Sequence, residues 1–199
     1  MKLFYSDASP YARCVRVLLR YYGVNDVAEV IVDPFVNDAE FLRCNPLAKV
    51  PCLSLNDGSS LYDSEVIMKF IDAKYGDSKL FAGQYNDWAN QCHFSLLKGM
   101  LDSAVSLRQE QLREQDGLRS DFWAARFEQA LLRGLKQVEQ LGLSHFQELT
   151  AQQVMLVCLL DYLDFRHPQL SWRKVVPALS LWHGNIAQTE LFLSTLPKR

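Results

Sequence analysis

The chain has 199 residues, of which 49% are hydrophobic, 12% aromatic and 22% charged. This composition is typical of one large or two small globular domains, and it excludes an intrinsically disordered chain. Lysine and arginine total 21 against 23 acidic residues, so the formal charge of −2 leaves no overall positive field for binding nucleic acid.

The longest uninterrupted apolar run, Val154–Leu160, has seven residues, whereas a membrane-spanning helix needs roughly 20. Asp7 interrupts the N-terminal segment before the apolar core of a signal peptide could form. We therefore expect a cytoplasmic protein with no membrane partner. The five cysteines form no CxxC pair and the four histidines lack metal-ligand spacing, which predicts reduced thiols and no metal site.

In residues 1–76, short strand-like runs alternate with helical patterns. The expected strands are Lys2–Tyr5, Ala28–Val32, Cys52–Leu55 and Leu61–Tyr62. The expected helices run from Ser9-Pro10 to Gly23, over Asn37–Cys44, and from Asp63-Ser64 to Gly76. Asn56-Asp57-Gly58 is a hairpin-turn signal, so the last two strands should pair antiparallel. The order βαβαββα predicts an α/β domain built on one mixed sheet.

Helical periodicity also predicts which side chains face the core. In the first helix the apolar side chains share one face, and Arg13, Arg16 and Arg20 lie on the other. In the helix after Asp63-Ser64, the residues expected to face inward are Val66, Ile67, Phe70, Ile71 and Tyr75.

The segment 76–86 is a polar connection that contains two glycines, which predicts a linker over residues 77–86, and residues 87–199 are expected to form an all-helical domain. Its expected helices are Asp87–Glu110, Asp121–Leu141, Thr150–Phe165, Pro177–Ile186 and Thr189–Leu196. Thr150 and Gln153 have the spacing of a capping box, which begins a helix and carries no chemistry.

Three short segments of the first domain are candidate binding residues. Ser9-Pro10 is a sufficient start for a helix, yet a helix N-terminus that follows a strand also attracts an anion through free N–H groups and the Ser9 hydroxyl. Pro51 interrupts strand pairing and leaves the Val50 backbone available to an incoming extended peptide; its alternative is an ordinary first residue of a strand. Asp63-Ser64 is a helix cap that is also suited to an amino-acid head group.

Together the three segments fit a short peptide that carries a reactive anion. The runs S-P-Y-A-R-C-V-R-V-L-L, N-P-L-A-K-V-P-C-L and L-Y-D-S-E-V-I-M-K-F-I, in this order, resemble the glutathione-binding half of the glutathione transferase superfamily. The C-terminal run T-A-Q-Q-V-M-L-V-C-L-L-D-Y-L-D-F-R is similar to that family's core helix, with Gln153 where the family commonly has Asp. The resemblance is closest to bacterial cytosolic members with serine in the active-site turn.

The resemblance implies a thioredoxin-like N-terminal domain, an all-helical C-terminal domain and a homodimer. It also implies that Ser9 hydrogen-bonds the glutathione sulfur and that Val50, before a cis Pro51, pairs with the cysteinyl backbone. Asp63 and Ser64 would hold the γ-glutamyl end, and Lys49 would approach the glycyl carboxylate. Glutathione would be a co-substrate, with no further cofactor.

Two other residues, Tyr5 and Cys14, lie near the active-site turn. Some relatives use a tyrosine near Tyr5 as the thiol partner, so Tyr5 stays open as an alternative to Ser9. Cys14 lies on the apolar helix face and is expected in the core. Because Ser9-Pro10-Tyr11-Ala12 contains no thiol, disulfide exchange through this turn is chemically unavailable.

The favoured hypothesis is a glutathione transferase that conjugates the glutathione thiolate to small electrophiles. The alternative is a non-catalytic interaction protein on the same fold, such as an RNA polymerase-associated type, because a fold does not fix a function.

Overall fold

The computed structural model describes residues 1–36, 38–82 and 87–198, and the chain divides into two compact units. Unit 1 contains Met1–Ala82 together with the segment from Glu190 onward, and unit 2 ends at Thr189. Residues 190–198 thus belong with unit 1, whereas the sequence had placed them in the helical domain. Residues 83–86 of the expected linker, Asn37 at the expected start of the second helix, and Arg199 lie outside the described residues.

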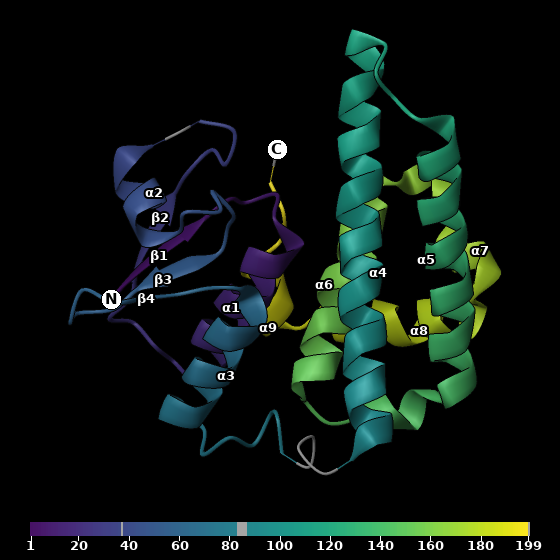
Figure 1. The fold of residues 1–199 in the computed structure, drawn as a ribbon. Helices are drawn as coiled ribbons and strands as arrows, with labels where there is room; N and C mark the ends of the chain where they lie inside the picture. The colour runs from purple at the N-terminus through teal and green to yellow at the C-terminus, as the bar shows by residue number, and fades with distance from the viewer. Residues whose placement is uncertain (37, 83–86, 199) are drawn as a thin grey trace. The chain divides into compact units, whose positions relative to one another are not determined.

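Unit 1 is a four-stranded mixed sheet with helices on both faces (Figure 1). Its elements are β1 (Lys2–Tyr5), α1 (Pro10–Tyr21), β2 (Ala28–Ile31), α2 (Ala39–Cys44), β3 (Cys52–Ser54), β4 (Ser60–Leu61), α3 (Ser64–Tyr75) and α9 (Glu190–Leu193). The strand order is β2-β1-β3-β4; β2 is parallel to β1, and β3 is antiparallel to both β1 and β4. The predicted thioredoxin-like βαβαββα order and the hairpin are confirmed.

The two faces of the sheet follow from side-chain alternation along β1. Phe4 points to the α2 face, where its ring centroid lies 5.7 Å from that of Phe41 and where Cys52 completes a buried cluster. Leu3 is paired with Leu53 in the register of β1 and β3, and both are fully buried. Figure 1 shows α2 on one side of the strands and α1 and α3 on the other.

Helix α1 begins and ends where its sequence predicts. Ser9 is the N-cap, Pro10 is the first helical residue, and Gly23 has the positive φ of 61° expected just after a helix. The predicted polar face is only partly exposed: Arg20 is exposed, but Arg13 and Arg16 are only 2% and 9% exposed. Arg13 donates to the Phe192 carbonyl oxygen at 3.1 Å and to the Thr195 hydroxyl at 3.3 Å, so the C-terminal segment covers this side of α1.

Helix α3 also differs from its predicted orientation. Ile67 and Ile71 are buried as expected, but Val66 is 46% exposed and Met68 is fully buried. The buried face of α3 therefore includes Met68 and Asp72 and excludes Val66. Helical periodicity does not predict a buried acid at position 72, because it does not show the groups that stabilise Asp72 there.

Asp72 fastens the end of α3 to the segment that follows. Its carboxylate accepts hydrogen bonds from the Tyr22 hydroxyl at 2.5 Å and from the amides of Leu80 and Phe81 at 3.1 and 3.0 Å. Gly76 leaves the space that Tyr22 needs, since a Cβ at Gly76 would lie 2.1 Å from the Tyr22 hydroxyl oxygen.

We expect Tyr22→Phe to lower the free energy of unfolding by about 1.5–3 kcal/mol, because the buried carboxylate of Asp72 loses a hydrogen-bond donor. Urea denaturation of the variant measures this change. Tyr21→Phe is the matched control, since Tyr21 is the exposed neighbour on the same helix. Equal stability of the two variants would contradict the role given to Tyr22.

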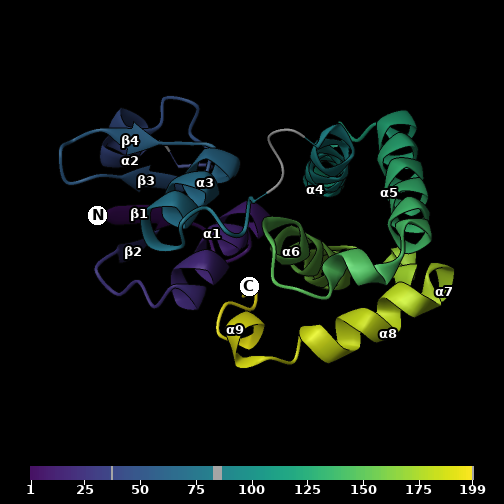
Figure 2. The same cartoon turned by 90° about the horizontal axis from the view of Figure 1, so that it is seen from below.

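Unit 2 is all-helical. Its helices are α4 (Trp88–Arg113), α5 (Asp121–Leu141), α6 (Ala151–Arg166), α7 (Trp172–Val175) and α8 (Pro177–Ile186). Figure 2 shows α6 beside α4 and α8, and residues 151–160 of α6 are all buried. Among the described residues, no helix has the length and apolar character that crossing a membrane requires.

Helix α6 begins at the predicted cap. The Thr150 hydroxyl accepts a hydrogen bond from the Gln153 amide at 3.1 Å, which confirms Thr150 as the N-cap. The Gln153 side chain donates to the Phe146 carbonyl oxygen at 2.5 Å, a contact to the preceding turn that the capping-box prediction did not include. Helix α7 was not predicted, since four residues are too few to show helical periodicity.

His167 joins the C-terminal end of α6 to α4 as a neutral imidazole. It is fully buried, its Nε2 lies 2.8 Å from the Ala104 carbonyl oxygen, and its Nδ1 lies 3.2 Å from the Gln111 side-chain nitrogen. These partners require a proton on Nε2 and an acceptor at Nδ1. Burial lowers the pKa of His167, and the nearby Arg108 and Arg166 lower it further.

A lowered pKa makes the unfolded state bind more protons than the folded state below pH ~6.5. The contribution of His167 to stability is therefore complete above that pH and is lost as the pH falls toward the folded pKa. We expect the free energy of unfolding to fall less steeply below pH ~6.5 in His167→Gln than in the wild type. Denaturant titrations at several pH values measure both slopes, and parallel slopes would contradict this account.

Candidate functional site

The three candidate segments meet at one end of the sheet of unit 1. Phe4 pairs with Cys52, so the antiparallel register places the turn after β1 beside the segment that leads into β3. Leu61 pairs with Leu53, which brings the end of β4 and the start of α3 to the same end. We call residues 6–9, 49–51 and 62–64 the loop cluster.

Ser9 uses its hydroxyl oxygen as an acceptor at the start of α1. The Ala12 amide donates to Ser9 Oγ at 3.2 Å, the geometry of an N-cap. A hydroxyl that accepts one hydrogen bond still carries a proton that it can donate. Ser9 is partly exposed, so the helix cap and a hydrogen bond to a ligand anion are compatible in one side chain.

The expected cradle of free amides is smaller than the sequence predicts. Pro10 has no N–H, the Ala12 amide is bound to the Ser9 side chain, and the Arg13 amide donates to the Ser9 carbonyl oxygen at 3.0 Å. These three positions therefore offer no free amide to an anion, which the Ser9 hydroxyl and the helix dipole would still stabilise.

Val50 presents an unpaired length of backbone next to this turn. The Val50–Pro51 peptide is cis, as the resemblance implied. Within residues 1–36, 38–82 and 87–198, neither the N–H nor the C=O of Val50 takes part in a backbone hydrogen bond. Both groups are thus available to pair with an extended peptide.

Asn45 holds the segment that carries Val50, and sequence reasoning missed this role. Asn45 is 1% exposed; its side chain donates to the Lys49 carbonyl oxygen at 2.7 Å and accepts from the Leu47 amide at 3.0 Å. The sequence showed only Asn45-Pro46 as a helix end, because the acceptor four residues later becomes visible only once the loop is folded.

If glutathione is the ligand, as the sequence resemblance implies, we expect Asn45→Ala to weaken its binding, because the Lys49 carbonyl and the adjoining Val50 lose their support. The free energy of unfolding should fall by about 1–3 kcal/mol, the cost of unsatisfied buried groups. Calorimetric titration with glutathione and urea denaturation measure the two effects. Asn25→Ala, at an exposed position, is the control, and unchanged affinity in Asn45→Ala would refute the role.

Asp63 and Ser64 begin α3 within the loop cluster. The Asp63 carboxylate caps the helix by accepting from the Glu65 amide at 3.1 Å, and the Tyr62–Asp63 peptide is cis. Ser64 is 6% exposed, whereas Asp63 is exposed. Lys49 is exposed as well, so its side chain reaches a ligand only from the solvent side.

The other two residues near the turn are buried. Tyr5 is packed below the Arg16 guanidinium, whose Cζ lies 4.5 Å from the ring centroid. Burial raises the pKa of Tyr5, so its phenol is neutral and acts only as a hydrogen-bond donor or acceptor. Cys14 is 1% exposed, as predicted for a core thiol.

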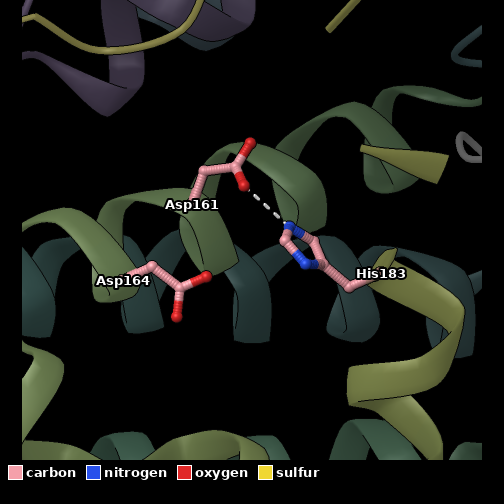
Figure 3. A group of neighbouring side chains, drawn as sticks. All are labelled: Asp161, Asp164 and His183. Carbon is pink, nitrogen blue, oxygen red and sulfur yellow. Dashed lines mark hydrogen bonds and ion pairs between the residues drawn. The ribbon is translucent and has the colours of Figure 1, made fainter. Parts of the chain in front are cut away.

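One group of possible metal ligands occurs in the described part of unit 2. Asp161, Asp164 and His183 bring their ligand atoms within 4.8 Å of one another (Figure 3). His183 Nε2 lies 2.8 Å from Asp161, and Arg173 donates to Asp164 at 2.6 Å and contacts His183 Nδ1 at 3.0 Å. Because the Arg173 guanidinium already supplies the positive charge, this group is a hydrogen-bond network joining α6, α7 and α8.

Two family models match the chain. Residues 3–79 match the glutathione S-transferase N-terminal domain, and residues 121–185 match the glutathione S-transferase C-terminal domain. A glutathione transferase family member from Pseudomonas fluorescens Pf-5, crystallised with bound glutathione, is 32% identical; the match covers 100% of this chain and 99% of that one, with a TM-score of 0.91. The chain belongs to the glutathione transferase family.

Two further relatives extend the family comparison. A glutathione transferase family structure from Pseudomonas fluorescens Pf-5, with bound S-(propanoic acid)-glutathione, is 30% identical over 100% of both chains, with a TM-score of 0.88. An uncharacterised protein of Escherichia coli K12 similar to glutathione transferases, YibF, is 26% identical over 100% of both chains. This family member therefore matches its relatives over both units.

Proposed function

We propose that this glutathione transferase conjugates the glutathione thiolate to small electrophiles. The observation that carries the proposal is the Ser9 hydroxyl at the N-terminus of α1, in one loop cluster with the unpaired Val50 backbone and the Asp63-Ser64 helix start. The Pseudomonas fluorescens relative with bound glutathione supports the ligand.

Each part of glutathione has a matching group in the loop cluster. The Val50 N–H and C=O would pair with the cysteinyl backbone. The γ-glutamyl end carries an ammonium and a carboxylate, which suit the Asp63 carboxylate and the N-terminus of α3 at Ser64. The cation of Lys49 would take the glycyl carboxylate. The sulfur then lies toward Ser9, whose hydroxyl donates a hydrogen bond to the thiolate and keeps its proton.

The energy that Ser9 and α1 supply is sufficient for the chemistry. Lowering a thiol pKa by about two units from about 8.5 requires about 2.7 kcal/mol in favour of the thiolate. One neutral hydrogen bond contributes about 0.5–1.5 kcal/mol, and a partly buried helix terminus contributes up to about 2 kcal/mol. The hydroxyl and the helix end together therefore meet the requirement, whereas Ser9 alone does not.

The reaction needs no covalent enzyme intermediate. The thiolate sulfur forms a bond to an electrophilic carbon; in a substitution the leaving group departs with its electron pair, and in an addition the neighbouring atom takes up a proton from water. Glutathione enters as a co-substrate, and we include no separate cofactor. The relative with bound S-(propanoic acid)-glutathione supports thioether products of this kind.

The proposal also includes a cytoplasmic homodimer. Several large apolar side chains are exposed on each unit, and a second copy of the chain would cover part of this surface. In unit 1 they include Phe35 and Leu47, and in unit 2 Leu118 and Phe122. Analytical ultracentrifugation of the full chain measures the oligomeric state.

We expect Ser9→Ala to raise the pKa of bound glutathione and to lower kcat/KM for conjugation by about tenfold, since about 1.4 kcal/mol of thiolate preference is lost. The loss of the cap should cost only about 1 kcal/mol of stability. Ser120→Ala is the matched control, because Ser120 caps α5 in the same way. Ultraviolet absorbance of the bound thiolate against pH measures the pKa.

Three results would contradict parts of the proposal. No binding at millimolar glutathione would favour a non-catalytic interaction protein on this fold. Binding with an unshifted thiol pKa would leave a ligand role without the mechanism. Full activity in Ser9→Ala would transfer the thiol contact to Tyr5 or to the backbone.

A further inference from the structure

Arg16 is a buried cation to which the proposed chemistry assigns no task. It lies two helical turns beyond Ser9 on α1 and is 9% exposed, although its sequence pattern placed it on the polar face of the helix. A buried guanidinium is costly unless it is paired, so its partners indicate what it holds in place.

The partners of Arg16 come from three different segments of unit 1. Its Nε donates to a Glu29 carboxylate oxygen on β2 at 3.0 Å, and its Nη1 lies 3.4 Å from the Asp7 carboxylate. Its Cζ lies 4.5 Å from the centre of the Tyr5 ring at the end of β1. The planar fork of arginine allows these contacts to be made at the same time.

Asp7 lies inside the turn that delivers Ser9. This turn runs from Ser6 to Ser9 and is closed by a hydrogen bond from the Ser9 amide to the Ser6 carbonyl oxygen at 3.0 Å. Arg16 thus ties the turn to the body of α1 from one side, while the Ala12 amide holds the Ser9 hydroxyl from the other.

Arg20 provides an internal comparison. It forms an ion pair with the same Glu29 and lies one turn further along α1. Loss of Arg20 therefore removes one ion pair of Glu29 and leaves the contact between Arg16 and Asp7 in place. An effect that depends on the turn should therefore occur when Arg16 is replaced and not when Arg20 is replaced.

We propose that Arg16 is a positioning residue that, through Asp7, fixes the turn between β1 and α1 so that the Ser9 hydroxyl is presented to the glutathione sulfur. This inference rests on the proposed function for its catalytic consequence. The tether between Arg16 and the turn exists without any ligand, so it has a test of its own.

The test compares Arg16→Gln, Asp7→Asn, the double variant and the control Arg20→Gln in the full-length chain. In the ligand-free protein, hydrogen exchange at the Ser9 and Ala12 amides should accelerate in the first three variants and not in Arg20→Gln. With glutathione bound, the thiol pKa should rise by about one unit in Arg16→Gln, which lowers kcat about tenfold at a pH below the pKa. The KM for glutathione should change little, since no binding contact is removed.

The double variant separates positioning through Asp7 from a direct effect of the charge on Arg16. Because the two residues act through one contact, the double variant should shift the thiol pKa no more than the larger single variant. Arg16→Lys should raise the thiol pKa less than Arg16→Gln does, but it should not keep the wild-type value, because a lysine cannot donate through two nitrogens at once. If Arg16→Gln folds poorly, Asp7→Asn weakens the same contact at a more exposed position by removing the negative charge.

Four outcomes would overturn the inference: unchanged exchange at Ser9 and Ala12, an unchanged thiol pKa, an equal effect of Arg20→Gln, or additive shifts in the double variant. Failure of the proposed function is a separate result. If wild-type protein leaves the glutathione thiol unshifted, the catalytic role of Arg16 is refuted together with that function, while the exchange data still decide whether the tether holds the turn.

Discussion

The antiparallel pairing of β3 with β1 is the constraint on which the candidate site depends. Because Phe4 is opposite Cys52, the end of one strand and the beginning of the other meet, and the hairpin to β4 brings the start of α3 to the same place. Three segments that are far apart in sequence thereby form one loop cluster. A parallel β3 would have carried Val50 to the opposite end of the sheet, away from Ser9.

In the loop cluster, some atoms that stabilise the fold are also those proposed to bind the ligand. Ser9 Oγ caps α1 and is also the group that would face a thiolate, and Asp63 caps α3 and is also the group that would face the amino-acid head group. The amides of Ala12 and Arg13 already donate to the hydroxyl and the carbonyl oxygen of Ser9, so they are not free to bind an anion. The positive end of α1 would still favour an anion through its dipole.

Sequence reasoning succeeded where the signal is local. The cap at Ser9, the left-handed Gly23, the hairpin after Ser54 and the N-cap at Thr150 each depend on neighbouring residues, and all are present. It failed where a partner lies far along the chain. The amphipathic pattern of α1 exposes its arginines, but Glu29 and the carbonyl of Phe192 pair with Arg16 and Arg13 and bury them. The support that Asn45 gives to the Lys49 carbonyl likewise needs the folded loop.

The contact of Arg13 with Phe192 and Thr195 has a consequence for biosynthesis. The helical unit is inserted between the two parts of unit 1, so the ribosome makes residues 1–82 long before the segment that covers α1. At a synthesis rate of about 5–20 residues per second, on the order of ten seconds separate the synthesis of the sheet from that of the segment that begins at Glu190. During that interval Arg13 is hydrated and α1 lacks the cover that residues 190–198 provide, so unit 1 is completed only after the helical unit has been made.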